Sequence, residues 1–162
     1  MSAQTEPGAG ELSEYYKTAL AAYEAGDRDQ AKTVWRYACR NGDRRSCEAL
    51  GLRQYLIRQK SSEIAWALEY GCDLGSGASC LALGQGYEMG TIGRGDLLYA
   101  ATYYEKACVE GNNRGCAFLG QNMYLGFGIP KDRAKGRRLM REACRAGDEY
   151  GCDRLQEYGI KP

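Results

Sequence analysis

The sequence predicts an all-α repeat protein built as a stack of helix pairs, and two observations support this prediction. The first is a stretch that occurs four times, with two cysteines eight positions apart and a glycine three residues after the first. The second is the period, because the first cysteines lie 33, 36 and 36 residues apart. A fixed period of this length indicates units that bury a continuous core by stacking on their neighbours. The four cysteine pairs are Cys39 and Cys47, Cys72 and Cys80, Cys108 and Cys116, and Cys144 and Cys152.

The segment before each first cysteine predicts a helix with one apolar face. An aspartate stands twelve residues before the cysteine in three copies, as Asp27, Asp96 and Asp132, and Ser61-Ser62 marks the start in the second copy. Such side chains accept hydrogen bonds from the free N–H groups of the first helical turn. Apolar residues then recur at helical spacing. The glycine after the first cysteine suits the left-handed residue that commonly ends a helix.

A second helix is predicted to begin after each second cysteine. Three copies contain the pair Leu-Gly, in which the glycine lets a neighbouring helix approach closely. Glycines and Pro130 then mark the loop before the next helix. An N-terminal helix from Leu12 completes the first pair, and a closing helix is expected from about Tyr150 to Tyr158, so we expect about nine helices. The Leu-Gly pairs are Leu50-Gly51, Leu83-Gly84 and Leu119-Gly120.

The run Leu83-Gly84-Gln-Gly-Tyr87-Glu-Met-Gly90, followed by Asp96 and Ala100-Ala101, resembles the Sel1-like repeat, a relative of the tetratricopeptide repeat. With its paired cysteines the chain resembles the Helicobacter cysteine-rich proteins over about residues 12 to 158. The resemblance implies a right-handed α/α superhelical solenoid of about four helix pairs plus a C-terminal capping helix. It departs from the family pattern at Met123, where tyrosine is usual, and in the second copy, which lacks that tyrosine. We expect a flexible tail over 1–10 and a single repeat domain over 11–160, with approximate units 11–42, 43–75, 76–111 and 112–147 and a cap at 148–160.

Redox catalysis, metal binding and structural disulfides are the three uses to weigh for the cysteine pairs. Thioredoxin-type catalysis needs a Cys-x-x-Cys pair, which the chain lacks. Zinc sites commonly combine close cysteine pairs with histidine, and the chain has no histidine. We therefore expect no metal or cofactor and four structural disulfides, each of which closes a nine-residue loop and contributes about 2.5 kcal/mol in the chain-entropy model. The expected pairs are Cys39–Cys47, Cys72–Cys80, Cys108–Cys116 and Cys144–Cys152.

An even cysteine count in fixed pairs is typical of a protein that folds in an oxidising compartment. The first ten residues do not have the pattern of an export signal. We therefore expect a mature or trimmed form from the bacterial periplasm or the cell exterior, with a reduced intracellular protein as the alternative. The 22 basic and 21 acidic residues nearly balance, which argues against a nucleic-acid partner, and no apolar run has the length of a membrane span.

Catalysis has little support in the sequence. The absence of histidine removes the commonest general base. The resemblance to the Helicobacter proteins raises β-lactam chemistry, but the Ser-x-x-Lys and Lys-Thr-Gly motifs of the serine enzymes do not occur. We expect no catalytic residue. A protein that binds β-lactams or peptidoglycan fragments, with weak hydrolase activity, stays the alternative.

The expected function is an adaptor that binds another protein or an extended peptide. In tetratricopeptide-like solenoids the first helices of the pairs line the concave face, and the resemblance assigns their inward positions. Tyr23, Tyr55 and Tyr124 share one repeat position, which Glu88 occupies in the third unit. Tyrosine suits a peptide groove because it offers a large rigid surface with a polar tip, although packing between repeats is another use of the same residues. The expected groove residues are Tyr16, Leu20, Tyr23, Leu52, Tyr55, Gln85, Glu88, Gln121 and Tyr124.

Basic residues are densest between 131 and 145, on the second helix of the fourth pair. Such a run forms a solvated convex face or a surface for an acidic partner or the anionic cell envelope.

Overall fold

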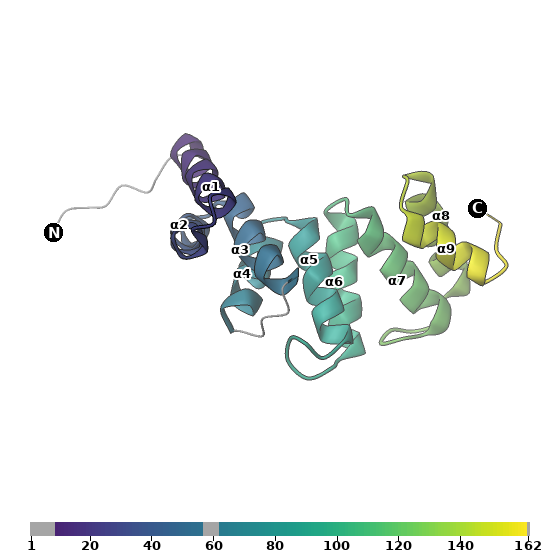
Figure 1. Cartoon of the computed structure of the whole chain (residues 1–162). Helices are drawn as coiled ribbons and strands as arrows, with labels where there is room; N and C mark the ends of the chain where they lie inside the picture. Colours follow the sequence, from purple (N-terminus) through teal and green to yellow (C-terminus); the bar gives the residue numbers. More distant parts are fainter. Residues whose placement is uncertain (1–8, 57–61, 162) are drawn as a thin grey trace. The chain divides into compact units, whose positions relative to one another are not determined.

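The computed structural model describes residues 9–56 and 62–161, which contain nine helices and no strand (Figure 1). The all-helical prediction is therefore confirmed for these residues. The chain divides into two compact units at Leu74 and Gly75, unit 1 with α1 to α4 and unit 2 with α5 to α9. The helices are α1 (Ala9–Glu24), α2 (Arg28–Arg40), α3 (Arg44–Leu56), α4 (Ser62–Asp73), α5 (Gly77–Glu88), α6 (Leu97–Val109), α7 (Asn113–Leu125), α8 (Arg133–Arg145) and α9 (Glu149–Glu157).

Unit 1 packs its helices in two pairs, α1 on α2 and α3 on α4, with α2 also against α3. Trp35 of α2 and Leu50 of α3 are fully buried among the small side chains of Ala19, Ala31 and Ala67. Small residues around one large ring let the helices approach closely, which is the packing that interdigitated cores require.

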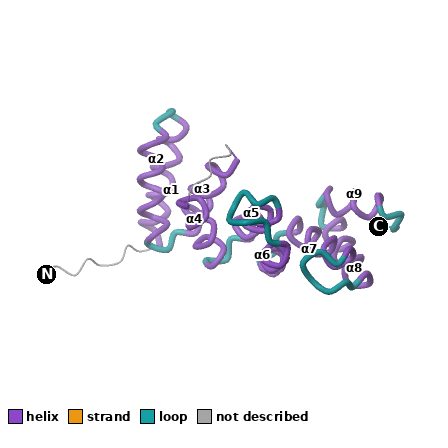
Figure 2. Tube along the Cα trace, turned by 90° about the horizontal axis from the view of Figure 1, so that it is seen from below, coloured by secondary structure: helices purple, strands orange, loops and turns teal. Residues whose placement is uncertain are grey.

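Unit 2 has two layers. Helices α5, α7 and α9 follow one another in one layer, and α6 and α8 pack on the other side (Figure 2). The buried residues Ala100, Tyr104, Leu119 and Leu139 form a core cluster between the layers. The odd-numbered helices therefore share one face of the unit.

The predicted aspartate caps are present. Asp27 accepts a hydrogen bond from the Gln30 N–H, and Asp132 accepts one from the Lys135 N–H. Asp96 accepts from two N–H groups at the start of α6. Ser61 lies outside the described residues.

The first helices of the later pairs begin three residues before the second cysteine, which is earlier than predicted. The reason is a second set of caps, each directly after the glycine that ends the previous helix. That glycine is left-handed in every copy, with φ from 79° to 90°. The next side chain, Asp43, Ser76, Asn112 or Asp148, accepts a hydrogen bond from an N–H of the new first turn.

Close helix crossings explain the small residues near the second cysteine. A Cβ atom on Gly115 would lie 2.5 Å from the Cβ of Ala107, and one on Gly84 would lie 2.5 Å from the ring of Tyr104. A Cβ atom on Gly120 would likewise lie 2.8 Å from the backbone oxygen of Gly136. The predicted role of the Leu-Gly pairs is therefore confirmed.

All eight cysteines are disulfide-bonded. The bridges Cys39–Cys47, Cys108–Cys116 and Cys144–Cys152 join Cα atoms 4.6, 4.4 and 4.7 Å apart, within the range that disulfides span. Each of these bridges joins the last turn of one helix to the first turn of the next.

Candidate binding surface

Three rings in unit 2 form a continuous stack, which we call the aromatic ladder. Tyr104 of α6 lies against Phe118 of α7 with ring centroids 4.8 Å apart, and Phe118 lies against Tyr150 of α9 at 4.2 Å. Tyr104 is fully buried, whereas Phe118 and Tyr150 are half-buried. The ladder therefore runs from the core of unit 2 to the face formed by α5, α7 and α9.

A carboxylate stands at the buried end of the ladder. Glu88, at the C-terminal end of α5, accepts a hydrogen bond of 2.5 Å from the hydroxyl of Tyr104. Glu88 itself is half-buried. One of the two carboxylate oxygens thus holds the ladder while the other can accept further hydrogen bonds.

Hydrogen-bonding groups also lie at the other end of the ladder. The hydroxyl of Tyr150 donates to the side-chain oxygen of Gln121, and the Gln121 amide donates to the hydroxyl of Tyr158 at 3.0 Å. The ring of Tyr158 stacks on Tyr124 with centroids 4.8 Å apart. Two of the expected groove residues, Gln121 and Tyr124, therefore belong to the same connected cluster as Glu88.

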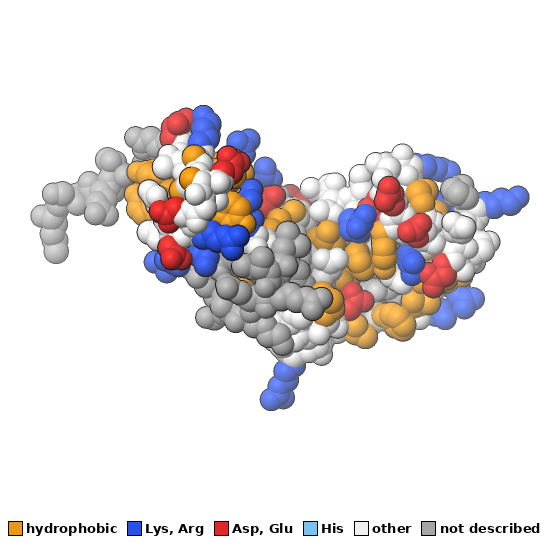
Figure 3. All heavy atoms as spheres, viewed as in Figure 1, with side chains coloured by type: hydrophobic (Ala, Val, Ile, Leu, Met, Phe, Trp, Pro, Cys, Tyr) orange, Lys and Arg blue, Asp and Glu red, His pale blue; other side chains and the backbone are white. Residues whose placement is uncertain are grey.

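We call this cluster the ladder face. On the side of unit 2 seen in Figure 3, hydrophobic side chains gather over the middle of the unit, with acidic and basic side chains around them. Such a mixture of half-exposed rings and hydrogen-bonding groups is typical of surfaces that bind other proteins. The ladder face comprises Glu88, Phe118, Gln121, Tyr124, Tyr150 and Tyr158, with Tyr104 beneath it.

Burial is the main influence on the phenol of Tyr150. It raises the pKa of Tyr150 from 10.0 to about 12, while the cation of Arg154 opposes the shift and the charge of Glu88 adds to it. Arg154 lies 5.1 Å from the centroid of the Tyr150 ring and forms an ion pair of 2.5 Å with Glu157. Tyr150 is therefore a neutral hydrogen-bond donor throughout the physiological pH range.

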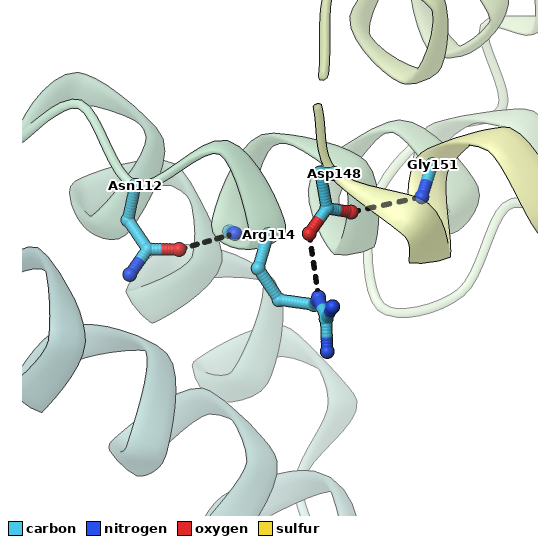
Figure 4. Close-up of polar contacts among 5 residues, drawn as sticks. Asn112, Arg114, Asp148 and Gly151 are labelled. Carbon is cyan, nitrogen blue, oxygen red and sulfur yellow. Dashed lines mark hydrogen bonds and ion pairs between the residues drawn. The ribbon is translucent and has the colours of Figure 1, made fainter. Parts of the chain in front are cut away.

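Arg114 and Asp148 fix the start of α9 against the start of α7 (Figure 4). The Arg114 Nε lies 2.7 Å from one oxygen of Asp148, whose other oxygen accepts a hydrogen bond of 2.8 Å from the Gly151 N–H. The Asp148 side chain is only 8% exposed, so this pair is shielded from solvent on one side. Because Tyr150 lies between Asp148 and Gly151, the pair also positions the outer ring of the ladder.

The expected groove residues of unit 1 mainly pack in that unit. Tyr16, Leu20 and Tyr23 lie against its core, and the Tyr23 ring lies 5.5 Å from the Trp35 ring and 4.6 Å from the Arg53 guanidinium. Leu52 is half-buried on α3. The side chain of Tyr55 lies outside the described part of the structure. In unit 2, Gln85 is half-buried on α5, one turn before Glu88.

Four residues of the cluster were not among the expected groove residues. Tyr104 belongs to the apolar stripe of its helix, and Phe118 directly precedes a Leu-Gly pair. Tyr150 and Tyr158 lie on and directly after the closing helix, which has no paired helix after it among the described residues. The detectable signal was that the closing helix and the residue directly after it provide two tyrosines, where an end cap needs only a polar surface.

The basic helix α8 buries Gly136, Leu139, Met140 and Ala143 and directs most of its basic side chains to solvent. Arg138 lies 3.8 Å from Glu142, and the Arg141 guanidinium donates to the backbone carbonyl of Lys161 at 2.8 Å. The predicted split between a buried apolar stripe and an exposed basic face is therefore present.

A cavity of about 310 Å³ lies between α6, α7 and the loop before α8. Leu119, Met123 and Ile129 form its apolar part, and Asp132 at its rim caps α8. Among the described residues, no group of three or more histidine, cysteine or acidic side chains could hold a metal ion. Within the same residues, no helix combines the length and apolarity that crossing a membrane requires.

Helix pairs joined by left-handed glycines and bridged by cysteines define a disulfide-stabilised helical-repeat protein. The family comparison identifies the repeat, because residues 77–112 and 113–148 match the model of the Sel1 repeat. The chain thus contains two Sel1 repeats, both in unit 2, and its cysteines are disulfide-bonded. No curated protein matches it in sequence.

Solved structures agree with this assignment. A Sel1 repeat protein from Oxalobacter formigenes superposes with a TM-score of 0.68 at 26% identity, over 76% of this chain and 95% of that one. Helicobacter pylori cysteine rich protein B gives a TM-score of 0.61 at 29% identity, over 86% of this chain and 96% of that one. A protective antigen from uropathogenic Escherichia coli, c5321, shares the fold with a TM-score of 0.78 at 20% identity, over 94% of this chain and 35% of its own length.

Proposed function

We propose that the protein is a scaffold that binds an extended segment of another protein on the face that α5, α7 and α9 form in unit 2. The observation that carries the proposal is the ladder face, where half-buried rings from α7 and α9 lie beside hydrogen-bonding groups of Glu88 and Gln121. Repeat solenoids commonly use such extended faces for binding. Tyrosine rings contribute large contact areas at a small cost in conformational entropy.

Binding is favoured over catalysis because the ladder face holds no activated nucleophile. Its titratable groups are tyrosines and one glutamate, and the chain has no histidine to act as a general base. A chromogenic β-lactam tests the hydrolase alternative. Turnover that is lost on Glu88→Gln or Tyr150→Phe would favour that alternative over the scaffold.

The disulfides support an oxidising compartment as the place of function, because thiols in the cytosol are kept reduced. We place the protein in the bacterial periplasm or outside the cell. The exposed basic side chains of α8 suit an acidic partner or the anionic envelope surface as a second, separate contact.

Photo-crosslinking tests the scaffold directly. A benzoylphenylalanine placed at Gln121 on the ladder face is expected to capture a discrete partner from an envelope extract. The same group at Arg137 on α8 serves as the matched control, because that position is exposed on the other layer of unit 2. Capture at Gln121 that disappears with Tyr124→Ala supports the proposal, whereas equal capture at both positions or none at Gln121 contradicts it.

A further inference from the structure

We infer that the ladder face selects a basic side chain: a lysine or arginine of the bound segment pairs with the carboxylate of Glu88. This inference rests on the proposed peptide-binding function and specifies the chemistry of the partner. The basic residue stands at one position of the bound segment, the position that lies next to the buried end of the aromatic ladder.

The first argument is the position of Glu88 in the repeat. Tyr23, Tyr55 and Tyr124 occupy the equivalent position in the other sequence repeats. The third repeat therefore has a negative charge where the others have a neutral ring. Packing alone does not require this exchange, because the ring of Tyr104 already fills the space beside Gly84. A charge at a position that otherwise carries a ring suits recognition of a charged ligand.

The second argument is that Glu88 lacks a compensating cation. Among the described residues, its side chain accepts one hydrogen bond, from the Tyr104 hydroxyl, and its charge also acts on Tyr150, which is neutral. A half-buried carboxylate is partly desolvated, and an opposite charge restores the lost stabilisation. The second carboxylate oxygen can accept a hydrogen bond from an ammonium or a guanidinium group.

The third argument concerns the cations that approach the ladder from the protein itself. Arg154 and Arg114 both lie over the ring of Tyr150, but Arg154 pairs with Glu157 at 2.5 Å and Arg114 pairs with Asp148 at 2.7 Å. Each arginine is therefore neutralised by its own carboxylate. Arg133 lies over a different ring, 5.5 Å from the centroid of Tyr124. At the buried end of the ladder, Glu88 contributes the charge, and that charge is negative.

The neighbouring rings suit the rest of such a side chain. Lysine and arginine carry an apolar stem that packs on hydrophobic surface while the charged group reaches a polar partner. The half-exposed ring of Phe118 lies one ring away from the hydroxyl that binds Glu88. A neutral ligand would leave the carboxylate buried without a counter-charge, and an acidic ligand would be repelled.

Selection from a phage-displayed library of random linear peptides tests this inference, with the full disulfide-bonded chain as the immobilised target. The wild-type protein is expected to enrich peptides with lysine or arginine at one position. Glu88→Gln, which keeps the shape of the side chain, should enrich peptides without that preference. Glu88→Lys should favour aspartate or glutamate at the same position. Glu105→Gln, an exposed acid on α6, is the matched control and should retain the basic preference.

A thermodynamic cycle on one enriched peptide makes the test quantitative. Glu88→Gln is expected to weaken binding of the basic peptide about 10-fold or more, because hydrogen bonds to charged groups are among the stronger ones. Replacement of the basic residue by norleucine should have a similar effect, and the two changes together should add little further loss.

The outcomes separate this inference from the proposed function. Wild-type enrichment without a basic preference, or an unchanged preference in Glu88→Gln, overturns the role of Glu88 and leaves peptide binding intact. If no peptide is enriched by the folded wild-type protein, both the scaffold function and the basic ligand are rejected.

Discussion

At the scale of single residues, Tyr150 combines several contacts with a raised pKa. Its ring stacks on Phe118, its hydroxyl donates to Gln121, and burial raises its pKa to about 12. The folded state holds the phenol proton of Tyr150 more tightly than the unfolded state does. The ionisation of this residue therefore leaves stability unchanged well below pH 10 and lowers it as the pH rises from about 10 towards 12.

The titration of Tyr150 can be measured by the near-ultraviolet absorbance of tyrosinate. The difference between the wild type and Tyr150→Phe should show one phenol that ionises later than an ordinary tyrosine. Glu88→Gln should lower the pKa of Tyr150, because the negative charge of Glu88 contributes to the shift. A Tyr150 titration near pH 10 would show that the ring is not buried in the ladder.

Gly136 is a second residue whose role can be tested alone. An added Cβ would lie 2.5 Å from the carbonyl oxygen of Gly120, so Gly136→Ala must separate α7 from α8. We expect a loss of about 1 to 3 kcal/mol in the free energy of unfolding, measured with urea. Gly95→Ala is the control, because its Cβ would meet nothing closer than 3.7 Å, and equal losses in both variants would contradict the close crossing.

At the scale of the helices, the repeat period, the capping aspartates and the glycines were enough to predict the helices themselves. They did not predict where the first helices of the later pairs begin. The aspartates before the first cysteines were recognised, but Asp43, Asn112 and Asp148 were not, because each directly follows a helix-ending glycine and reads as part of the turn. The ladder was also not predictable. Its stacking joins α6, α7 and α9, so it depends on the distances between helices and not on any local pattern.

Asp148 has two separable roles at the start of α9, as a cap and as the partner of Arg114. Asp148→Asn keeps a capping oxygen and removes the charge, so it should cost less stability than Asp148→Ala, which should lose about 1 to 2 kcal/mol. Thermal unfolding followed by circular dichroism measures both variants. If Asn and Ala are equally destabilising, the ion pair and not the cap is the main contribution.

At the scale of the whole molecule, the bridges differ in access to solvent. Cys39 and Cys47 are fully buried, whereas Cys108, Cys116, Cys144 and Cys152 are partly exposed. Reduction requires a thiolate to reach a sulfur atom.

We therefore expect a mild reductant to open Cys108–Cys116 and Cys144–Cys152 before Cys39–Cys47. Alkylation of the freed thiols at successive times, followed by peptide mass spectrometry, gives the order. In urea all three should react at similar rates, which controls for differences between the bonds themselves. Early opening of Cys39–Cys47 in the native protein would contradict the burial of that bridge.

The turns that carry the cysteines have a consequence for biosynthesis. The turn at Gly26 has no cysteine, yet the Asp27 N–H donates to the carbonyl of Ala22 in the same way that the Asp43 N–H donates to Ala38. Backbone hydrogen bonds and a left-handed glycine thus shape such a turn without any sulfur. In a nascent chain the two thiols of each pair are brought together by a few neighbouring residues. Oxidative folding can then proceed one repeat at a time, from the N-terminus onwards, with each cysteine meeting its correct partner before the next pair is made.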